Sequence, residues 1–140
     1  MIVRSVLASF VLLGVVGLCA AGELSVEDFQ FDGPVGCQGA KVEKAADNHF
    51  KITLGHAPNE PGWANHLQFR ILRNAKGKDL KITAVFAGET GYSFVSNHSS
   101  WSYDGNEWRP VTGYNSRTSR DGNVLTRTAE LSFPVLEQAL

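Results

Sequence analysis

The stretch "LKITAVFA", residues 80–87, decides the fold class of this 140-residue chain. Its even-numbered positions, from Leu80 to Phe86, are all apolar, whereas Lys81 and Thr83 stand between them. Apolar and polar side chains that alternate with a period of two are typical of a strand with one face on a core and the other toward solvent. The stretch therefore predicts a β-strand.

Short runs of the same kind recur along the chain between clusters of turn residues, and no segment after residue 21 has a long helical period. The predicted strands span residues 25–31, 40–44, 49–54, 66–72, 80–87, 101–103, 107–111, 124–127 and 130–133. Residues 46–48 (Ala-Asp-Asn) are expected to form a hairpin turn. About nine strands at this spacing predict an all-β fold, a two-sheet antiparallel β-sandwich of jelly-roll-like form.

The first 21 residues have the pattern of an export signal. Arg4 precedes an apolar run from Val6 to Leu18, and small residues follow at Cys19 to Ala21. The run is about 13 residues long, shorter than the roughly 20 that a transmembrane helix needs. We therefore expect residues 1–21 to be a signal peptide and the product to be periplasmic or extracellular, without a stable membrane anchor. Residues 22–134 would then form one β-sandwich domain, and residues 135–140 a tail with which a further domain could begin.

Charge and cysteine content exclude several classes of protein. The 13 Lys and Arg residues nearly balance the 14 Asp and Glu residues and are scattered along the chain, whereas a nucleic-acid partner would need a basic face. Cys37 is the only cysteine after residue 21, so neither an intramolecular disulfide nor a four-cysteine zinc site is expected in the exported product. Cys37 is predicted to be a buried or partly exposed structural thiol.

No pattern of catalytic or metal-ligating residues is present. The four histidines, His49, His56, His66 and His98, form no pair at a metal-ligand spacing, and Pro58 prevents a helix that would align His56 with Glu60. His49 and His66 fall on the polar phase of their strands and are expected to be solvated. The loop carboxylates Asp104, Glu107 and Asp121 are also expected to be solvated. We therefore expect no catalytic residue, no metal and no cofactor in this chain.

The aromatic stretch "WSYDGNEWRPV", residues 101–111, allows two interpretations. Asp-Gly-Asn at 104–106 predicts a hairpin turn, with Trp101 and Tyr103 in one phase and Trp108 facing them from the returning strand. The favoured interpretation is thus a hairpin stabilised by packed aromatic rings. The alternative is a sugar-stacking platform of exposed rings, for which the candidate ligand-binding residues are Trp63, Trp101, Tyr103 and Trp108. A calcium loop is disfavoured because only Asp104 and Glu107 are available as acidic ligands.

Three segments in order, "GWANHLQFRI" (62–71), "AKGKDLKITAVFAG" (75–88) and "WSYDGNEWRPV" (101–111), followed by a short strand near residues 124–127, suggest a family. Together they resemble the amino-terminal β-sandwich of the zinc metallocarboxypeptidase family, in its cytosolic-carboxypeptidase-like branch. Phe31-Asp32-Gly33 corresponds approximately to the opening turn of the family pattern. The second element of that pattern has a Trp shortly before a Phe-Arg pair, whereas here Trp63 lies farther from Phe69-Arg70. The resemblance spans residues 29–133.

In that family the sandwich precedes a catalytic domain that holds zinc through an H-x-x-E pair and a later histidine. No residue of this chain matches those positions, so no zinc ligand or catalytic residue is carried over. The resemblance implies a non-catalytic exported accessory domain that packs on a peptidase domain and helps to shape its substrate entrance. The alternative is a carbohydrate-binding module with a glycan as partner. The two differ in the exposure of the rings, since a sugar platform needs two solvent-facing and roughly coplanar rings.

Overall fold

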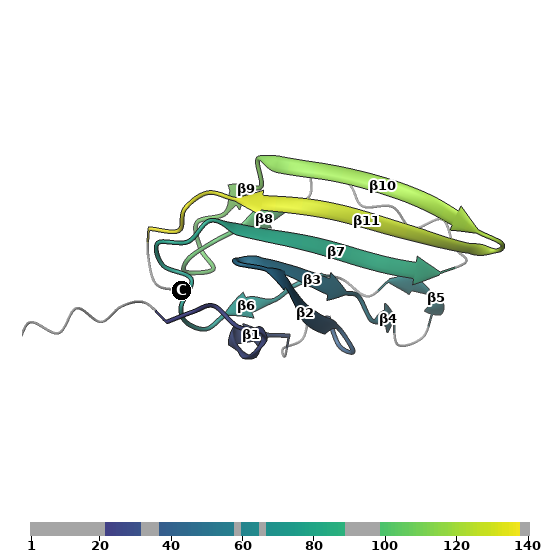
Figure 1. Cartoon of the computed structure of the whole chain (residues 1–140), viewed down its shortest axis with the longest axis horizontal. Helices are drawn as coiled ribbons and strands as arrows, with labels where there is room; N and C mark the ends of the chain where they lie inside the picture. The colour runs from purple at the N-terminus through teal and green to yellow at the C-terminus, as the bar shows by residue number, and fades with distance from the viewer. Residues whose placement is uncertain (1–21, 32–36, 58–59, 65–66, 89–98, 138–140) are drawn as a thin grey trace, which may run out of the picture.

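The computed structural model describes residues 22–31, 37–57, 60–64, 67–88 and 99–137 (Figure 1). Apart from one turn of 3-10 helix, η1 (Val26–Asp28), all of its regular elements are strands, so the prediction of an all-β fold is confirmed. The predicted signal peptide at 1–21 lies outside the described residues, as do His66 and His98. Within the part described, no helix has the length and apolar character needed to cross a membrane.

A five-stranded sheet, the main sheet, forms the body of the molecule. Its order is β10 (Gly113–Asp121), β11 (Val124–Phe133), β7 (Leu80–Gly88), β3 (His49–Thr53) and β2 (Lys41–Ala46) (Figure 1). Three of its four pairings are antiparallel, but β3 and β7 run parallel, with Phe50 opposite Ile82. The prediction of a purely antiparallel sandwich is therefore wrong at this pair. A parallel pair needs a crossover connection, which residues 54–79 supply.

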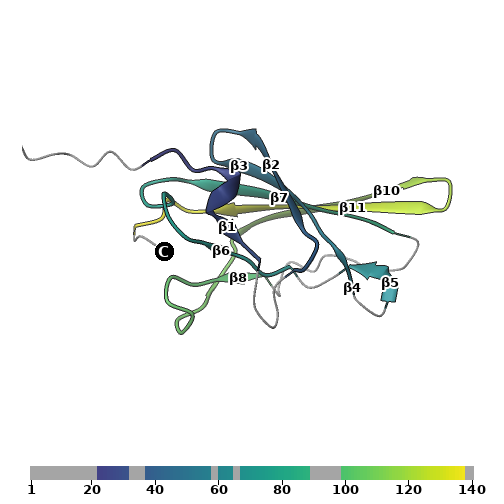
Figure 2. The ribbon, with the colours of Figure 1, turned by 90° about the horizontal axis from the view of Figure 1, so that it is seen from below.

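Six short strands pair two by two outside the main sheet. β1 (Phe29–Gln30) pairs with β6 (Arg70–Ile71), β4 (His56–Ala57) with β5 (Glu60–Ala64), and β8 (Ser100–Trp101) with β9 (Arg109–Pro110). In the view of Figure 2, β6 and β8 lie to one side of the long strands β7, β10 and β11. This arrangement is consistent with a β-sandwich.

The core lies between the main sheet and the short elements. The predicted alternation of β7 is confirmed, because Ile82, Ala84 and Phe86 are buried whereas the side chains between them are only partly buried. Neighbouring strands and the short elements contribute the other main buried residues, which are Leu24, Phe29, Phe50, Ile52, Leu54, Ile71, Ala75, Leu80, Ala129, Leu131 and Leu136. Burying such side chains contributes roughly 1.5–3 kcal/mol each, so this layer supplies most of the stability.

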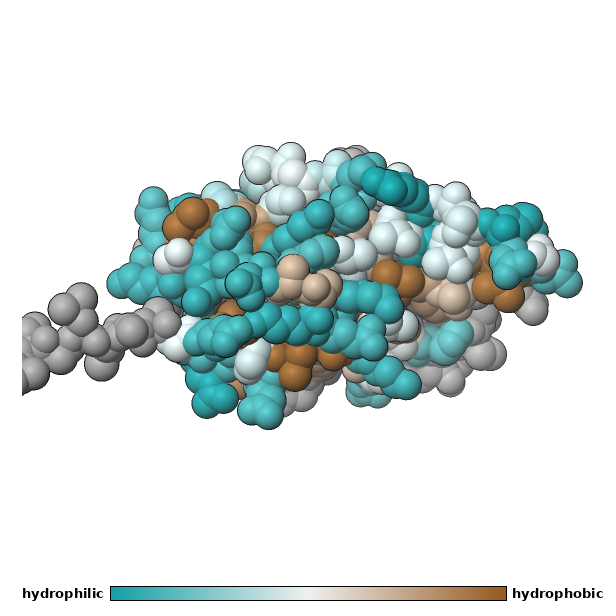
Figure 3. All heavy atoms as spheres, in the orientation of Figure 1, coloured by the Kyte–Doolittle hydropathy of each residue, from teal (hydrophilic) through white to brown (hydrophobic). Residues whose placement is uncertain are grey.

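The opposite face of the main sheet is polar. The side of the molecule seen in Figure 3 is mostly hydrophilic, with scattered apolar residues. Lys51 pairs with Glu43 at 3.0 Å and Lys81 with Glu130 at 3.8 Å, both across neighbouring strands. A sheet with one core face and one polar face accounts for the period-two sequence pattern.

The β10–β11 hairpin is longer than the sequence indicated. Residues 124–127 and 130–133, predicted as two strands, belong to one continuous strand, and β10 was not predicted at all. Gly122 and Asn123 make the two-residue turn between Asp121 and Val124, and Gly122 has a φ of 57°, the conformation that the first turn position requires. Because β10 is polar on both faces near the turn, it carries no alternation from which a strand could be inferred.

Other predicted strands are shorter in the structure. In the predicted strand 25–31, η1 precedes the two residues of β1, and the described part of 66–72 contains only β6. The predicted strand 101–103 keeps only Trp101, from β8, and 107–111 keeps the two residues of β9. The Ala-Asp-Asn turn is confirmed between β2 and β3, where Asn48 has a φ of 52°. Short strands make fewer backbone hydrogen bonds to a partner strand. Near β1 and β8, side chains accept some of the backbone N–H groups instead, as Asp28 does for Ser25 and Asp104 for Asn106.

Candidate functional site

The aromatic hairpin, residues 99–111, is the strongest candidate site. β8 and β9 pair with Trp101 opposite Arg109, and the Val111 N–H donates to the Ser99 carbonyl at 3.0 Å. Gly105 has a φ of 77°, as expected of the predicted Asp-Gly-Asn turn. The hairpin itself is thus confirmed, with a longer loop between shorter strands.

Two side chains fix the hairpin loop. The Asp104 Oδ1 accepts hydrogen bonds from the Asn106 N–H at 2.8 Å and the Glu107 N–H at 3.0 Å, and Ser102 Oγ lies 3.0 Å from the same oxygen. Ser102 Oγ also accepts the Gly105 N–H at 3.0 Å. The backbone bonds from Asn106 and Glu107, followed by the Ser102 bond, lower the pKa of Asp104 from 3.8 to about 2. Asp104 is therefore ionised at neutral pH, and its carboxylate stabilises the loop conformation.

The rings of this hairpin pack edge to face. Trp101 and Tyr103 have centroids 5.1 Å apart at an interplanar angle of 86°, and Trp101 meets Phe133 of β11 at 6.5 Å and 83°. The Arg109 guanidinium carbon lies 5.5 Å from the Trp101 centroid and 5.8 Å from that of Tyr103. These contacts form a stable cation–π and aromatic unit on half-buried rings.

Trp108 stands apart from that unit. Its side chain is exposed, and its Nε1–H donates to the Gly105 carbonyl at 3.0 Å. The expectation that Trp108 would face Trp101 and Tyr103 is corrected by the strand register, which places Arg109 opposite Trp101. The loop spans residues 102–108, so Trp108 belongs to the loop and not to the returning strand β9.

The hairpin also carries a shallow hollow of about 180 Å³, lined by Tyr103, Asp104, Glu107 and Arg109. Pockets that hold drug-sized ligands usually enclose roughly 300–1,000 Å³. The hollow can accept a few polar groups, such as peptide amides, a side chain or sugar hydroxyls. It offers no pair of coplanar rings, because the Trp101 and Tyr103 planes are nearly perpendicular.

The C-terminal segment at residues 134–137 is attached to the aromatic hairpin. The Tyr103 hydroxyl accepts the Glu137 N–H at 2.9 Å. Leu136 is buried in the core; its N–H donates to the Lys78 carbonyl at 3.0 Å, and its carbonyl accepts the Gly77 N–H at 2.7 Å.

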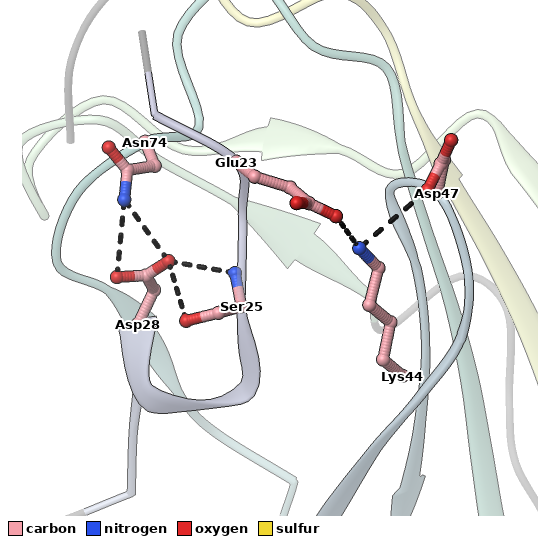
Figure 4. Close-up of polar contacts among 6 residues, drawn as sticks. All are labelled: Glu23, Ser25, Asp28, Lys44, Asp47 and Asn74. Carbon is pink, nitrogen blue, oxygen red and sulfur yellow. Dashed lines mark hydrogen bonds and ion pairs between the residues drawn. The ribbon is translucent and has the colours of Figure 1, made fainter.

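A second polar cluster surrounds the fully buried carboxylate of Asp28. It accepts the Ser25 N–H at 2.8 Å and the Asn74 amide at 3.3 Å (Figure 4). It also accepts the Arg73 Nε–H at 2.6 Å. Burial by itself raises the pKa of this carboxyl, but the hydrogen bonds from Ser25, Arg73 and Asn74 together outweigh it and lower the pKa. The cluster joins η1 to the segment after β6 and has a structural role. Sequence reasoning missed it, because residues 25–31 were expected to be a regular strand.

The remaining predicted residues lie apart from the hairpin. Trp63 belongs to β5, and its side chain is not among those described. His49, expected to be solvated, is half-buried and its Nε2 lies 2.8 Å from Thr83 Oγ1. Cys37 is a free, buried thiol as predicted, and burial raises its pKa. Among the described side chains, no three of His, Cys, Asp and Glu converge as a metal site would require.

Comparison with known proteins found no matching family model, no matching curated protein and no matching solved structure. The resemblance to the zinc metallocarboxypeptidase accessory domain therefore stays a prediction.

Proposed function

We propose that this chain is a non-catalytic, exported accessory domain that binds a peptidase domain of the zinc metallocarboxypeptidase type through the aromatic hairpin. The observation that carries the proposal is the exposed Trp108, 55% accessible, on a loop that is held rigid by its own hydrogen bonds. Residues 1–21 are proposed to direct export to the periplasm or the cell exterior. The short strand pairs are proposed to be the second layer of a jelly-roll-like β-sandwich.

The composition of the hairpin suits a protein interface. Trp, Tyr and Arg are the residues that most often carry binding energy at such interfaces. Arg109 lies over the Tyr103 ring, and the exposed Trp108 belongs to the same hairpin. A loop that is already ordered loses little conformational entropy on binding. The C-terminal segment bonded to Tyr103 would bring a covalently attached peptidase domain next to this surface.

The expected contribution of Trp108 follows from its exposure. A Trp side chain covers roughly 150–250 Å² when buried, so covering its exposed half removes on the order of 110 Å² from water. At about 25 cal/mol per Å² this contributes about 3 kcal/mol, or about a hundredfold in affinity.

The test is binding of the purified protein to a purified zinc metallocarboxypeptidase catalytic domain from the same genome, measured by isothermal titration calorimetry. We expect Trp108→Ala to weaken binding about a hundredfold. Val124→Ala, which removes an exposed apolar side chain at the far end of the β10–β11 hairpin, serves as the matched control and should bind as the unmodified chain does. Absence of binding, or equal binding by both variants, would contradict the proposal.

A carbohydrate-binding module is the second candidate, because the exposed Trp108 belongs to the same hairpin as a hollow that is lined by two carboxylates and a guanidinium. A single ring with adjacent hydrogen-bonding groups can hold one sugar residue. The perpendicular Trp101 and Tyr103 rings do not extend that platform. Titration with a panel of soluble glycans distinguishes the candidates, since only a sugar module would give saturable binding that Trp108→Ala removes.

A further inference from the structure

The two edges of the main sheet differ in how they are protected. β2, at one edge, is short and has a register shift between Lys44 and Ala46, and Lys44 bonds Glu23 and lies 3.6 Å from Asp47 (Figure 4). Bulges, lysines and covering segments are the devices that keep an edge strand from pairing with other chains. The β2 edge is thus closed to strand addition.

β10 forms the other edge, and among the described residues it has no bulge, no lysine and no strand paired to its open side. It is nine residues long, pairs with β11 without a register shift, contains no proline, and is exposed from Asn115 to Asp121. In Figure 1 it forms the outer border of the sheet, and its turn with β11 lies at the end of the molecule opposite β8 and β9. A long, regular and exposed edge is a template for an additional strand.

The turn defines which backbone groups of β10 face outward. In a two-residue turn the flanking residues, here Asp121 and Val124, form the closing hydrogen-bonded pair. Because such pairs alternate along an antiparallel ladder, the odd-numbered residues of β10 bond to β11. Ser116, Thr118 and Arg120 therefore direct their N–H and C=O groups toward the open edge.

The charge of this edge is positive. Among the described residues, neither Arg117 nor Arg120 has a carboxylate partner, and Asp121 at the turn is the only acidic residue on β10. Pairing places Arg117 on the same face as Thr128 and Arg120 on the same face as Leu125, so the two arginines extend from opposite faces. Glu130, the nearest acidic residue on β11, pairs with Lys81.

We propose that β10 binds an extended acidic segment of a partner protein as an added antiparallel β-strand. Backbone hydrogen bonds to Ser116, Thr118 and Arg120 supply the register, and two acidic side chains three positions apart meet Arg117 and Arg120. A second copy of this chain fits less well, because twofold pairing centred on Thr118 makes the two Arg117 side chains diagonal neighbours that repel each other. The proposal concerns an edge remote from the aromatic hairpin and does not rest on the function proposed above.

The probe is a fluorescein-labelled nine-residue peptide of Thr and Val with two Glu residues three positions apart, titrated with the purified protein by fluorescence anisotropy. We expect the Glu peptide to bind saturably. The same peptide with Gln in place of Glu should bind with about tenfold lower affinity, since each exposed ion pair contributes up to about fivefold. Arg117→Glu combined with Arg120→Glu should give a similar loss. Lys76→Glu, a charge reversal at one position in the exposed loop before β7, should alter affinity less than twofold.

The backbone part of the proposal has its own pair of variants. Thr118→Pro removes one outward N–H while leaving the bonds to β11, and an edge strand tolerates such a proline. It should abolish peptide binding, whereas Thr118→Val should bind as the unmodified protein does. Hydrogen exchange of the unmodified protein is the second measurement, in which saturating peptide should protect the Ser116, Thr118 and Arg120 amides.

Three results would overturn the proposal. They are equal affinity for the Glu and Gln peptides, no added protection at the three amides, and concentration-dependent dimerisation in sedimentation analysis that Thr118→Pro removes. The last result would assign the β10 edge to a second copy of this chain.

Discussion

Asp28→Asn tests the polar cluster that joins η1 to the rest of the fold. The change keeps the shape of the side chain but removes its charge and turns one oxygen into a donor, which must face the Ser25 N–H or the Arg73 Nε–H. Hydrogen bonds to a charged group contribute about 1.5–3 kcal/mol each, and a buried donor left unsatisfied costs about 1–3 kcal/mol. Arg73 is 65% exposed, so water replaces much of its lost ion pair. We expect a loss of about 2–4 kcal/mol in the free energy of unfolding.

Urea unfolding followed by circular dichroism at pH 7 measures this loss, with Asp47→Asn as the control because the Asp47 side chain is 98% exposed. The control should change the unfolding free energy by less than about 0.5 kcal/mol. The pKa of Asp28 is lowered below its ordinary value of 3.8, so its stabilisation is present above that pH and is lost as the pH falls through the lower folded-state pKa. The unmodified protein should therefore lose stability below about pH 4 more steeply than the Asn variant does. An Asp28→Asn loss no larger than that of Asp47→Asn would refute the reasoning.

Three further predictions concern the hairpin, the thiol and the core. Asp104→Ala should raise the hydrogen-exchange rates of the Asn106 and Glu107 amides at least tenfold, because both amides donate to the Asp104 carboxylate. In the unmodified chain the protection of these amides should persist to about pH 3. The pKa of Asp104 is about 2, and its hydrogen bonds weaken only as the pH falls through that value. Cys37 should react with a thiol reagent only at the unfolding rate, because it is buried and its pKa is raised; rapid labelling in native buffer would contradict this. Phe50→Ala should reduce the unfolding free energy by about 3–5 kcal/mol, measured by urea unfolding, because Phe50 is fully buried; a loss below about 1 kcal/mol would contradict its place in the core.

The parts of the fold that the sequence predicts are those with a strict alternation. β7 and β3 each have one apolar and one polar face, and a strand with one buried face requires apolar and polar residues to alternate in the sequence. β10 could not be predicted, because it owes its strand conformation to pairing with β11 and buries almost none of its side chains. The parallel pairing of β3 with β7 depends on where the crossover returns, and this is a property of the whole chain.

The candidate site was predictable in its location but not in its geometry. The Asp-Gly-Asn turn between aromatic residues indicated a hairpin, and Trp101 and Tyr103 do pack together. The loop 102–108, which is closed by the hydrogen bonds of Ser102 and Asp104, places Arg109 and not Trp108 opposite Trp101. The attachment of Leu136 and Glu137 to the hairpin loop and core has no signal in the local sequence.

The measurement that tests the central claim most directly is the emission of Trp108 as the only tryptophan. Trp63→Phe combined with Trp101→Phe leaves Trp108 alone, since the chain has three tryptophans, and keeps a ring at position 101. The account predicts emission that acrylamide quenches readily in the free protein, and that shifts to the blue and becomes protected when a zinc metallocarboxypeptidase catalytic domain is added, with no response to glycans. Protection by a glycan, or emission that the catalytic domain leaves unchanged, would contradict it.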